Sequence, residues 1–492
     1  MLFNQIDFFI FLTVVFTAYW KIRQNRARII LLLSASLIFY MSWNTWHVII
    51  ILMITAGDYM SGRLMEVYPR HKRIYLVIAV SLNICVLFVF KYFNFFMSTI
   101  SVVFGSLPGT ESISSGLLLP IGISFYIFQS MSHTIEVYRG TIKPEKSFIN
   151  YAVFVSFFPQ LVAGPIVRAK DFLCQIDKKK IFLTRRFYLG IIFILCGLCK
   201  KIIIADYLGA VLVDGVYANP HLHTFIDSLL ALYGYAFQIY NDFSGYTDIA
   251  IGSAMLFGYR LPVNFNSPYI ASSLKDFWKR WHISLSGWIR DYLYVSLGGS
   301  RVKKLKIVRN ILLTWLICGL WHGASWHFVL WGLMHGAALV AETRIRKKST
   351  DFFEKISSGN MPSRDKPSIP IRIFLRARGS GMLNIARRVI IFHFICLTWI
   401  IFRADTPSAA IHIYRNLLTF STVLRETAVL KGAAMLCIAI ALHFITQQTV
   451  RNARLRFVRS KLWIKITILV MGTLLCIWFS NLETTPFIYF QF

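Results

Sequence analysis

The sequence predicts an all-α integral membrane protein that crosses the bilayer several times. Hydrophobic residues make up 56% of its 492 residues and the mean hydropathy is +0.57, whereas a soluble chain of this size would need far more charged surface. Apolar stretches recur along the whole length, and several approach the roughly 20 residues that a helix needs to span a bilayer. They lie at residues 6–20, 29–42, 75–92, 187–204, 389–402 and 463–480.

The N-terminal stretch is expected to be a retained span. The opening run MLFNQIDFFIFL has neither a positively charged start nor a small-residue cleavage site, both of which a signal peptide would carry. Further along, segments 117–131 and 151–167 are shorter or interrupted by glycine and proline. Such segments are typical of tilted, broken or re-entrant elements, which need protein or water around their backbone.

The charge pattern predicts which loops share a side of the membrane. The net charge is +31, but the cations fall in short blocks between apolar stretches, which argues against a basic nucleic-acid-binding face. Such blocks face the cytoplasm in membrane proteins, and loops 106–116 and 206–224, which lack Lys and Arg, should lie opposite. The blocks are Lys21–Arg28, Arg70–Arg73, Lys178–Arg186, Arg301–Arg309, Arg344–Lys348 and Arg451–Lys461.

The spacing of two basic blocks predicts a re-entrant hairpin. Arg301–Arg309 and Arg344–Lys348 are both expected on the cytoplasmic side, yet only residues 310–343 lie between them. Two full crossings would need about 40 residues plus a turn. The segment must therefore enter and return, with the run WHG at 321–323 near its turning point. His322 would then lie at membrane depth, beside a polar cavity.

Residues 1–492 are predicted to form one membrane domain, with residues 344–388 as a basic cytoplasmic loop within it. This loop carries twelve Lys or Arg against three acidic residues and is rich in Pro and Gly, so it should be partly helical at best. The eight cysteines mostly lie in apolar runs. They are interpreted as small buried side chains, and no metal site is expected.

Two histidines in Trp-rich apolar surroundings are the leading catalytic candidates. His282 lies in FWKRWHISLSGWIRDYLYVSLGG (277–299), and His322 lies beside Trp321 in GLWHGASW (319–326). Ionisable side chains at membrane depth are costly to insert and are functional candidates by default. A neutral imidazole can accept a hydroxyl proton as the general base of acyl transfer, while Trp321 can exclude water and offer an indole donor. The alternative is a packed histidine that serves a backbone carbonyl.

A polar stretch follows the first histidine. His282 and Ser286 are four residues apart and would share a helix face, which Arg290 extends; Ser284 and Asp291 lie nearby. This stretch is interpreted as a polar lining that positions a substrate or orients His322. A polar clamp between helices is an equally strong alternative for Arg290 and Asp291.

Other motifs are absent or weak. The sequence has no Gly-rich phosphate loop, G-x-S-x-G elbow or H-E-x-x-H helix, which argues against an ATP-driven pump, an α/β hydrolase and a zinc protease. Asp242 and Asp248 lie in the apolar run YNDFSGYTDIAIG and are candidates for a tunnel or cation site. A turn stabilised by Asp and Ser side chains is the favoured alternative.

At these residues the chain resembles the membrane-bound O-acyltransferase family, and within it the branch of the bacterial alginate O-acetyltransferase membrane subunit. The resemblance covers nearly the full length, and the joint occurrence of RWHISLS and WHG is its most specific part. The matching runs are LLPIGISFYIFQS (118–130), FFPQLVAGPIVR (157–168), DFSGYTDIAIG (242–252), both histidine runs and TPFIYFQF (485–492).

The resemblance implies a ring of tilted helices with re-entrant segments around a central tunnel, with His322 catalytic and His282 its essential partner. It further implies a multi-pass protein of the bacterial cytoplasmic membrane that binds no cofactor and uses acetyl-CoA as donor. The LGG run at 297–299 favours the acetyl-transferring branch over relatives that transfer D-alanine to teichoic acid. The acetyl group would cross the membrane to a periplasmic SGNH-type acetyltransferase partner.

The acceptor implied by the resemblance is an exopolysaccharide such as alginate, with peptidoglycan or cellulose as alternatives. Two other classes stay open. One is a lipid acyltransferase with long-chain acyl donors, which a larger pocket at His322 would indicate. The other is a flippase of an acylated carrier, for which inverted repeats would be expected; the sequence shows none.

Overall fold

The computed structural model describes residues 1–104, 118–162, 164–357, 381–419, 427–480 and 486–488. Within these ranges every regular element is a helix, which confirms the all-α prediction. The predicted apolar stretches all lie in helices, because long apolar runs in a bilayer satisfy their backbone hydrogen bonds only within the helix.

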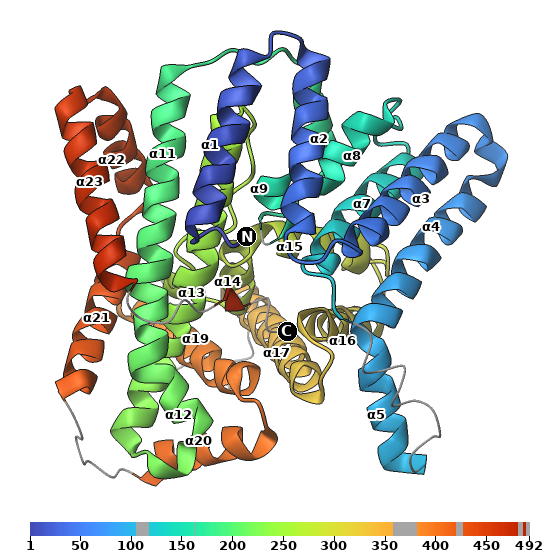
Figure 1. The fold of residues 1–492 in the computed structure, drawn as a ribbon. Coiled ribbons are helices and arrows are strands. Elements are labelled where there is room, and N and C mark those ends of the chain that lie inside the picture. The colour runs from blue at the N-terminus through green and yellow to red at the C-terminus, as the bar shows by residue number, and fades with distance from the viewer. Residues whose placement is uncertain (105–117, 163, 358–380, 420–426, 481–485, 489–492) are drawn as a thin grey trace.

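The N-terminal apolar stretches form a series of helices along one side of the molecule (Figure 1). α3 and α4 pack against each other, and α4 continues through a π-helix into α5, so that Pro69–Phe104 forms one continuous helical segment. The elements are α1 (Ile6–Lys21), α2 (Asn25–Met41), α3 (His47–Val67), η1 (Pro69–His71), α4 (Lys72–Leu87), the π-helix η2 (Phe88–Tyr92) and α5 (Phe93–Phe104).

The segments that the sequence predicts to be broken are broken. α7 begins after Gly122, whose φ of 73° lies in the left-handed region that favours glycine. Residues 164–168 are non-helical yet mostly buried, and the Ile166 N–H donates to Ser284 Oγ at 3.0 Å. The elements are α7 (Ile123–Tyr138), α8 (Phe148–Ser156), α9 (Phe158–Leu161) and α10 (Ala169–Ile176).

The centre of the molecule is built on α13 (Phe225–Leu256), a helix that is buried along most of its length. Thr224 and Asp227 form a capping box at its start. α11 packs closely along it because glycines face each other: a Cβ at Gly197 would lie 2.5 Å from the Gly245 carbonyl oxygen. The preceding elements are α11 (Thr184–Leu198), the π-helices η3 (Cys199–Asp206) and η4 (Gly209–Val213), α12 (Asp214–Ala218) and η5 (Pro220–Leu222).

The C-terminal half contains the predicted hairpin. α16 ends at His322 and α17 begins at Trp326, and the two helices pack against each other. The elements are η6 (Pro268–Ile270), α14 (Leu274–Arg280), α15 (Ile283–Trp288), the π-helix η7 (Ile289–Tyr294), α16 (Lys304–His322), α17 (Trp326–Ser357), α19 (Gly381–Arg403), α20 (Pro407–Thr419), α21 (Thr427–His443), α22 (Gln447–Arg459) and α23 (Leu462–Phe479).

The predicted basic loop 344–388 is helical at both ends. α17 continues to Ser357 and α19 starts at Gly381, whereas 358–380 lie outside the described residues.

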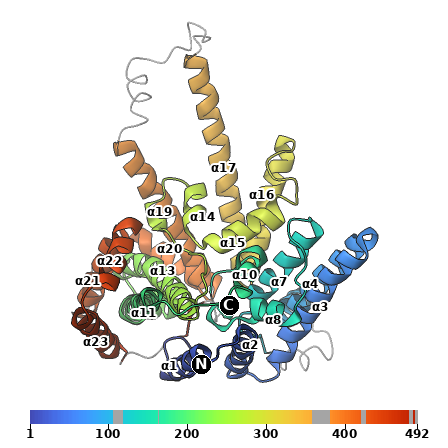
Figure 2. The same cartoon turned by 90° about the horizontal axis from the view of Figure 1, so that it is seen from above.

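Seen from above, the helices form a rough circle around α15, and α17 projects far beyond it (Figure 2).

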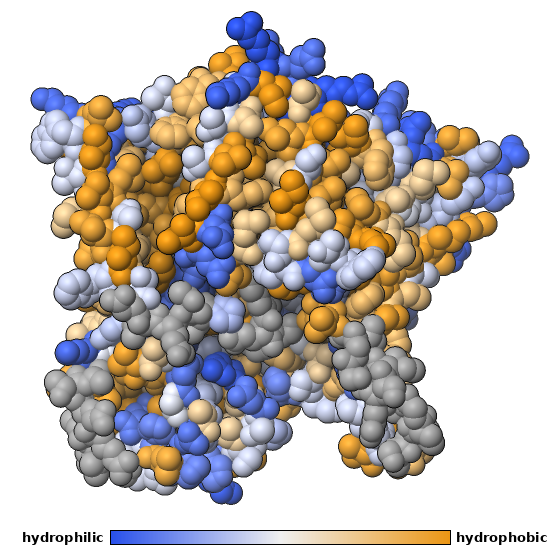
Figure 3. Space-filling view, viewed as in Figure 1, coloured by the Kyte–Doolittle hydropathy of each residue, from blue (hydrophilic) through white to orange (hydrophobic). Residues whose placement is uncertain are grey.

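The surface has the pattern of a membrane protein. An apolar belt covers the outside between a hydrophilic upper rim and a hydrophilic lower region (Figure 3). Among the described residues, five helices are long and apolar enough to cross a bilayer, or up to six if α21 and α22 form one broken span. The α1–α2, α3–α4 and α22–α23 connections and the start of α11 lie at one end, whereas α12 and α20 lie at the other (Figure 1). Four of the six predicted basic blocks therefore lie at the same end of the molecule: Lys21–Arg28, Arg70–Arg73, Lys178–Arg186 and Arg451–Lys461.

Candidate functional site

His322 lies at the end of α16, where the hairpin turns. Its side chain is 3% exposed and is enclosed by aromatic rings. Trp321 lies at 4.9 Å between ring centroids, Trp331 at 4.9 Å and Phe402 at 5.2 Å, all edge to face. Close approach of the two helix backbones at Gly319 fixes this position, since a Cβ there would lie 2.3 Å from the Phe328 carbonyl oxygen.

His282 also packs against the Trp321 ring. The indole centroid is 6.0 Å from His282 and 4.9 Å from His322, so one side chain contacts both histidines. Phe243 packs edge-on against His282 at 4.6 Å. The structure thus brings the two predicted histidines, forty residues apart in the sequence (282 and 322), against one indole ring.

The backbone at His282 differs from the prediction. Its φ is 42°, a left-handed conformation that is uncommon for residues other than glycine and concentrates at functional sites. His282 therefore precedes α15 as its N-cap, and the helix changes to π geometry from Ile289. The regular helix face predicted for His282, Ser286 and Arg290 does not form, because the π-helix shifts the register between α15 and Arg290.

A cavity of about 90 Å³ reaches His322 and has room for several water molecules. His322 and Trp321 form part of its wall, whereas His282 is fully buried and does not line it. Leu119, also in the wall, is 37% exposed, so the cavity borders the molecular surface. The other lining residues are Lys91, Pro120, Ile121, Gly122, Ile123, Ser124, Phe125 and Val162.

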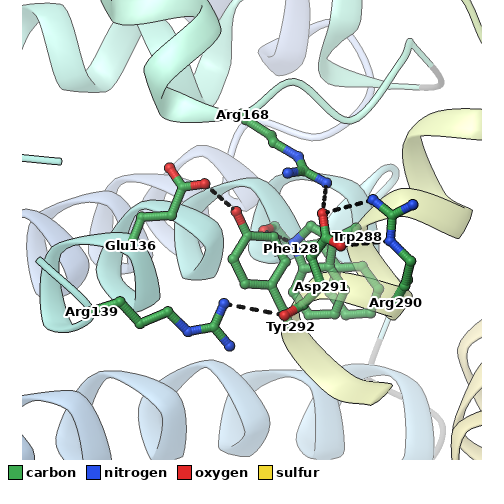
Figure 4. Close-up of polar contacts among 8 residues, drawn as sticks. All are labelled: Phe128, Glu136, Arg139, Arg168, Trp288, Arg290, Asp291 and Tyr292. Carbon is green, nitrogen blue, oxygen red and sulfur yellow. Dashed lines mark hydrogen bonds and ion pairs between the residues drawn. The ribbon is translucent and has the colours of Figure 1, made fainter. Parts of the chain in front are cut away.

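The polar residues after His282 form an arginine-rich cluster. Arg168 and Arg290 both bond the Asp291 carboxylate, and Arg139 donates to the Asp291 carbonyl oxygen at 3.1 Å (Figure 4). Burial favours the neutral form of Asp291, but hydrogen bonds from Arg290 and Arg168 outweigh it and lower the pKa of the carboxyl. Tyr292 donates to Glu136 at 2.6 Å beside them.

Aromatic rings connect this cluster with the histidines. Trp288 stacks on Phe128 at 3.8 Å, and Phe128 lies 5.7 Å from Trp321. Both Phe128 and Arg139 are positioned by α7, whose first turn lines the cavity. The 16 residues of α7 correspond to about 24 Å at 1.5 Å per residue, so the cluster and the cavity lie at opposite ends of this helix.

The two predicted serines bond to neighbouring groups. Ser284 Oγ donates to Asn264 Oδ1 at 2.6 Å and accepts from the Ile166 N–H, so it supports the non-helical segment 164–168. Ser286 Oγ donates to the Trp281 carbonyl oxygen at 3.2 Å. Neither lines the cavity.

The turn predicted around Asp242 and Asp248 is wrong, because both residues lie inside α13. Their carboxylates form ion pairs instead of a turn: Lys201 lies 2.6 Å from Asp242, and Lys200 lies 2.7 Å from Asp248. Asp242 also accepts the backbone N–H of Ile488 at 2.9 Å. Cations from η3, more than thirty residues away in the sequence, could not be assigned as partners from spacing alone.

Lys91 is the residue that the sequence analysis missed. It lies in η2, lines the cavity and donates from Nζ to the Trp321 carbonyl oxygen at 2.6 Å. A signal was present, since Lys91 is a single cation within the apolar run LFVFKYFNFF, and an isolated charge at membrane depth suggests function.

Comparisons with known proteins identify relatives of this chain. Residues 142–358 match the sequence profile of the membrane-bound O-acyltransferase family. A probable alginate O-acetylase, AlgI, of Pseudomonas aeruginosa is 36% identical over 86% of this chain and 76% of its own length. A peptidoglycan O-acetyltransferase of Helicobacter pylori is 33% identical over 86% and 81%. A teichoic acid D-alanyltransferase of Bacillus subtilis is 31% identical over 61% and 72%.

Proposed function

Because this chain belongs to the membrane-bound O-acyltransferase family, we propose that it transfers acetyl groups from a cytoplasmic donor toward a polysaccharide outside the membrane. It is a multi-pass membrane protein and an O-acyltransferase. One observation carries the proposal: His322 forms part of a cavity wall and shares the Trp321 ring with His282.

The chemistry assigned to His322 is general-base catalysis. Its imidazole takes the proton of an acceptor hydroxyl while the hydroxyl oxygen attacks the thioester carbonyl. The tetrahedral intermediate then collapses, the carbon–sulfur bond breaks, and the imidazolium returns the proton to the thiolate. His282 does not line the cavity, so it acts through Trp321 as a positioning residue.

Acetyl-CoA is the proposed donor, because phosphates suit the arginine cluster of Arg139, Arg168 and Arg290. Arginine binds phosphate oxygens through its planar fork of donors, and the Arg290 side chain is 65% exposed.

The proposed location is the bacterial cytoplasmic membrane, with the basic blocks facing the cytoplasm. Relatives named for alginate and peptidoglycan acetylation support an extracytoplasmic polysaccharide as the final acceptor. Alginate is favoured over peptidoglycan because the alginate relative has the higher identity. A periplasmic SGNH-type acetyltransferase is the proposed partner that receives the acetyl group.

The test follows radiolabelled acetyl groups from acetyl-CoA with the purified full chain in nanodiscs and the purified SGNH-type partner as acceptor. The wild-type chain should release CoA and transfer label, whereas folded His322→Ala and His282→Ala variants should not. His335→Ala is the matched control, since His335 is equally buried on α17 but does not line the cavity. Turnover in His322→Ala would refute the assigned base, and passage of intact acetyl-CoA would favour a transporter.

A further inference from the structure

Lys91 is a cation built into an apolar span. It lies in the long segment Pro69–Phe104, and its side chain is half-buried. Nζ donates to the Trp321 carbonyl oxygen at 2.6 Å, reaches the His322 carbonyl oxygen at 3.5 Å, and lies 6.0 Å from the Trp321 ring centroid. Lys91 thus lies on η2, between α4 and α5, and its side chain contacts residues of the candidate site.

The Lys91 ammonium has donor capacity beyond these bonds. An ammonium carries three N–H donors, and two carbonyl oxygens take two of them at most. Lys91 also lines the cavity with His322. Trp321 lines the same cavity, and its buried indole N–H has no acceptor within the described part of the chain. A positive charge and a second donor therefore lie in one cavity wall with the proposed base.

Capping of the α16 C-terminus does not by itself explain why a charged residue occupies position 91. The C-terminal carbonyls of a helix attract cations, but a neutral donor is already present: Tyr92 Oη donates to the Leu320 carbonyl oxygen at 2.9 Å. A charge in an apolar span costs more than a neutral donor. The π geometry of η2, which places both side chains at α16, is frequent at functional sites.

We propose that the Lys91 ammonium stabilises the negative charge that develops on the acyl carbonyl oxygen during transfer at His322. The inference rests on the proposed function. As the acceptor oxygen bonds to the carbonyl carbon, the π electrons move to the carbonyl oxygen, and His322 holds the proton. Lys91 donates a hydrogen bond to that oxyanion without losing its proton. The charge returns to the carbon–oxygen bond when the thiolate leaves.

The experiment measures CoA release from acetyl-CoA by the full chain in nanodiscs, with the purified periplasmic SGNH-type partner as acetyl acceptor. Lys91→Met should lower kcat by about 10²–10³-fold, the loss typical of removing one oxyanion donor, with little change in KM. Lys91→Gln removes the charge but can still bond the Trp321 carbonyl, so it should fold and show a similar loss. Lys91→Arg keeps the charge and should recover at least part of the rate.

Tyr92→Phe is the matched control, because it removes a neutral cap of α16 from the neighbouring position. It should leave kcat near the wild-type value. Wild-type kcat in Lys91→Gln would overturn the inference. So would a change in KM alone, or equal losses of kcat and thermal stability in Lys91→Arg, Lys91→Gln and Tyr92→Phe. Absence of CoA release by the wild-type chain would instead contradict the proposed function.

Discussion

Substitution of Gly319 by alanine should displace His322 without altering any side chain of the site. Gly319 lies on α16 one turn before His322, where the α17 backbone passes closest. A Cβ at this position would lie 2.3 Å from the Phe328 carbonyl oxygen, whereas ordinary contact begins at 3.4 Å. Phe328 O belongs to the backbone, so the obstacle cannot rotate away. The helices must separate by roughly 1 Å, a displacement that can cost about 10²-fold in rate.

The assay combines CoA release with thermal unfolding of the purified chain. Gly319→Ala should lower kcat by about 10²-fold and the free energy of unfolding by about 1–3 kcal/mol, as overpacked cores do. Gly215→Ala in α12 is the control, because a Cβ there meets nothing within 4 Å, and it should be neutral or slightly stabilising. Wild-type turnover by a stable Gly319→Ala protein would show that close backbone approach does not position His322.

Three further substitutions test other parts of the structure. Lys201→Met leaves the buried Asp242 carboxylate without its cation and should lower stability by about 3–5 kcal/mol; an unchanged melting temperature would contradict the ion pair. Phe487→Ala removes a fully buried ring and should cost about 3–5 kcal/mol, which chemical denaturation would measure against wild type. Arg290→Ala breaks only an exposed pair with Asp291, worth about 0–1 kcal/mol, so stability should stay constant while KM for acetyl-CoA rises and KM for acetyl-pantetheine does not. Equal KM changes for both donors would contradict the proposal that Arg290 binds the phosphates of acetyl-CoA.

The helices and the position of His322 were predictable because local rules fix them. Apolar length gave four of the five candidate spans but not His47–Val67, and the short distance between two basic blocks indicated a helical hairpin that turns just after His322. Glycine and proline marked the broken segments around Gly122 and residues 164–168. In each case the signal lies within a few tens of residues of the structure that it predicts.

The rest depends on partners that are distant in the sequence. Lys91 meets Trp321 across 230 positions, and Asp242 meets Lys201 on another helix. Without knowledge of this cation, an aspartate in an apolar run is predicted to lie in a turn and not in a buried helix. The positive φ of His282 likewise has no marker in the sequence, because residues other than glycine adopt it only uncommonly.

The contact between Asp242 and Ile488 has a consequence for how the protein is made. The two residues are 246 positions apart, so α13 leaves the ribosome long before the segment that covers it is translated. Phe487 then stacks on Tyr246 at 4.5 Å and packs near Phe243, the neighbour of His282. Pairings at such separation form slowly. A nascent chain interrupted before residue 486 could thread all its helices into the bilayer and still lack a finished wall beside His282.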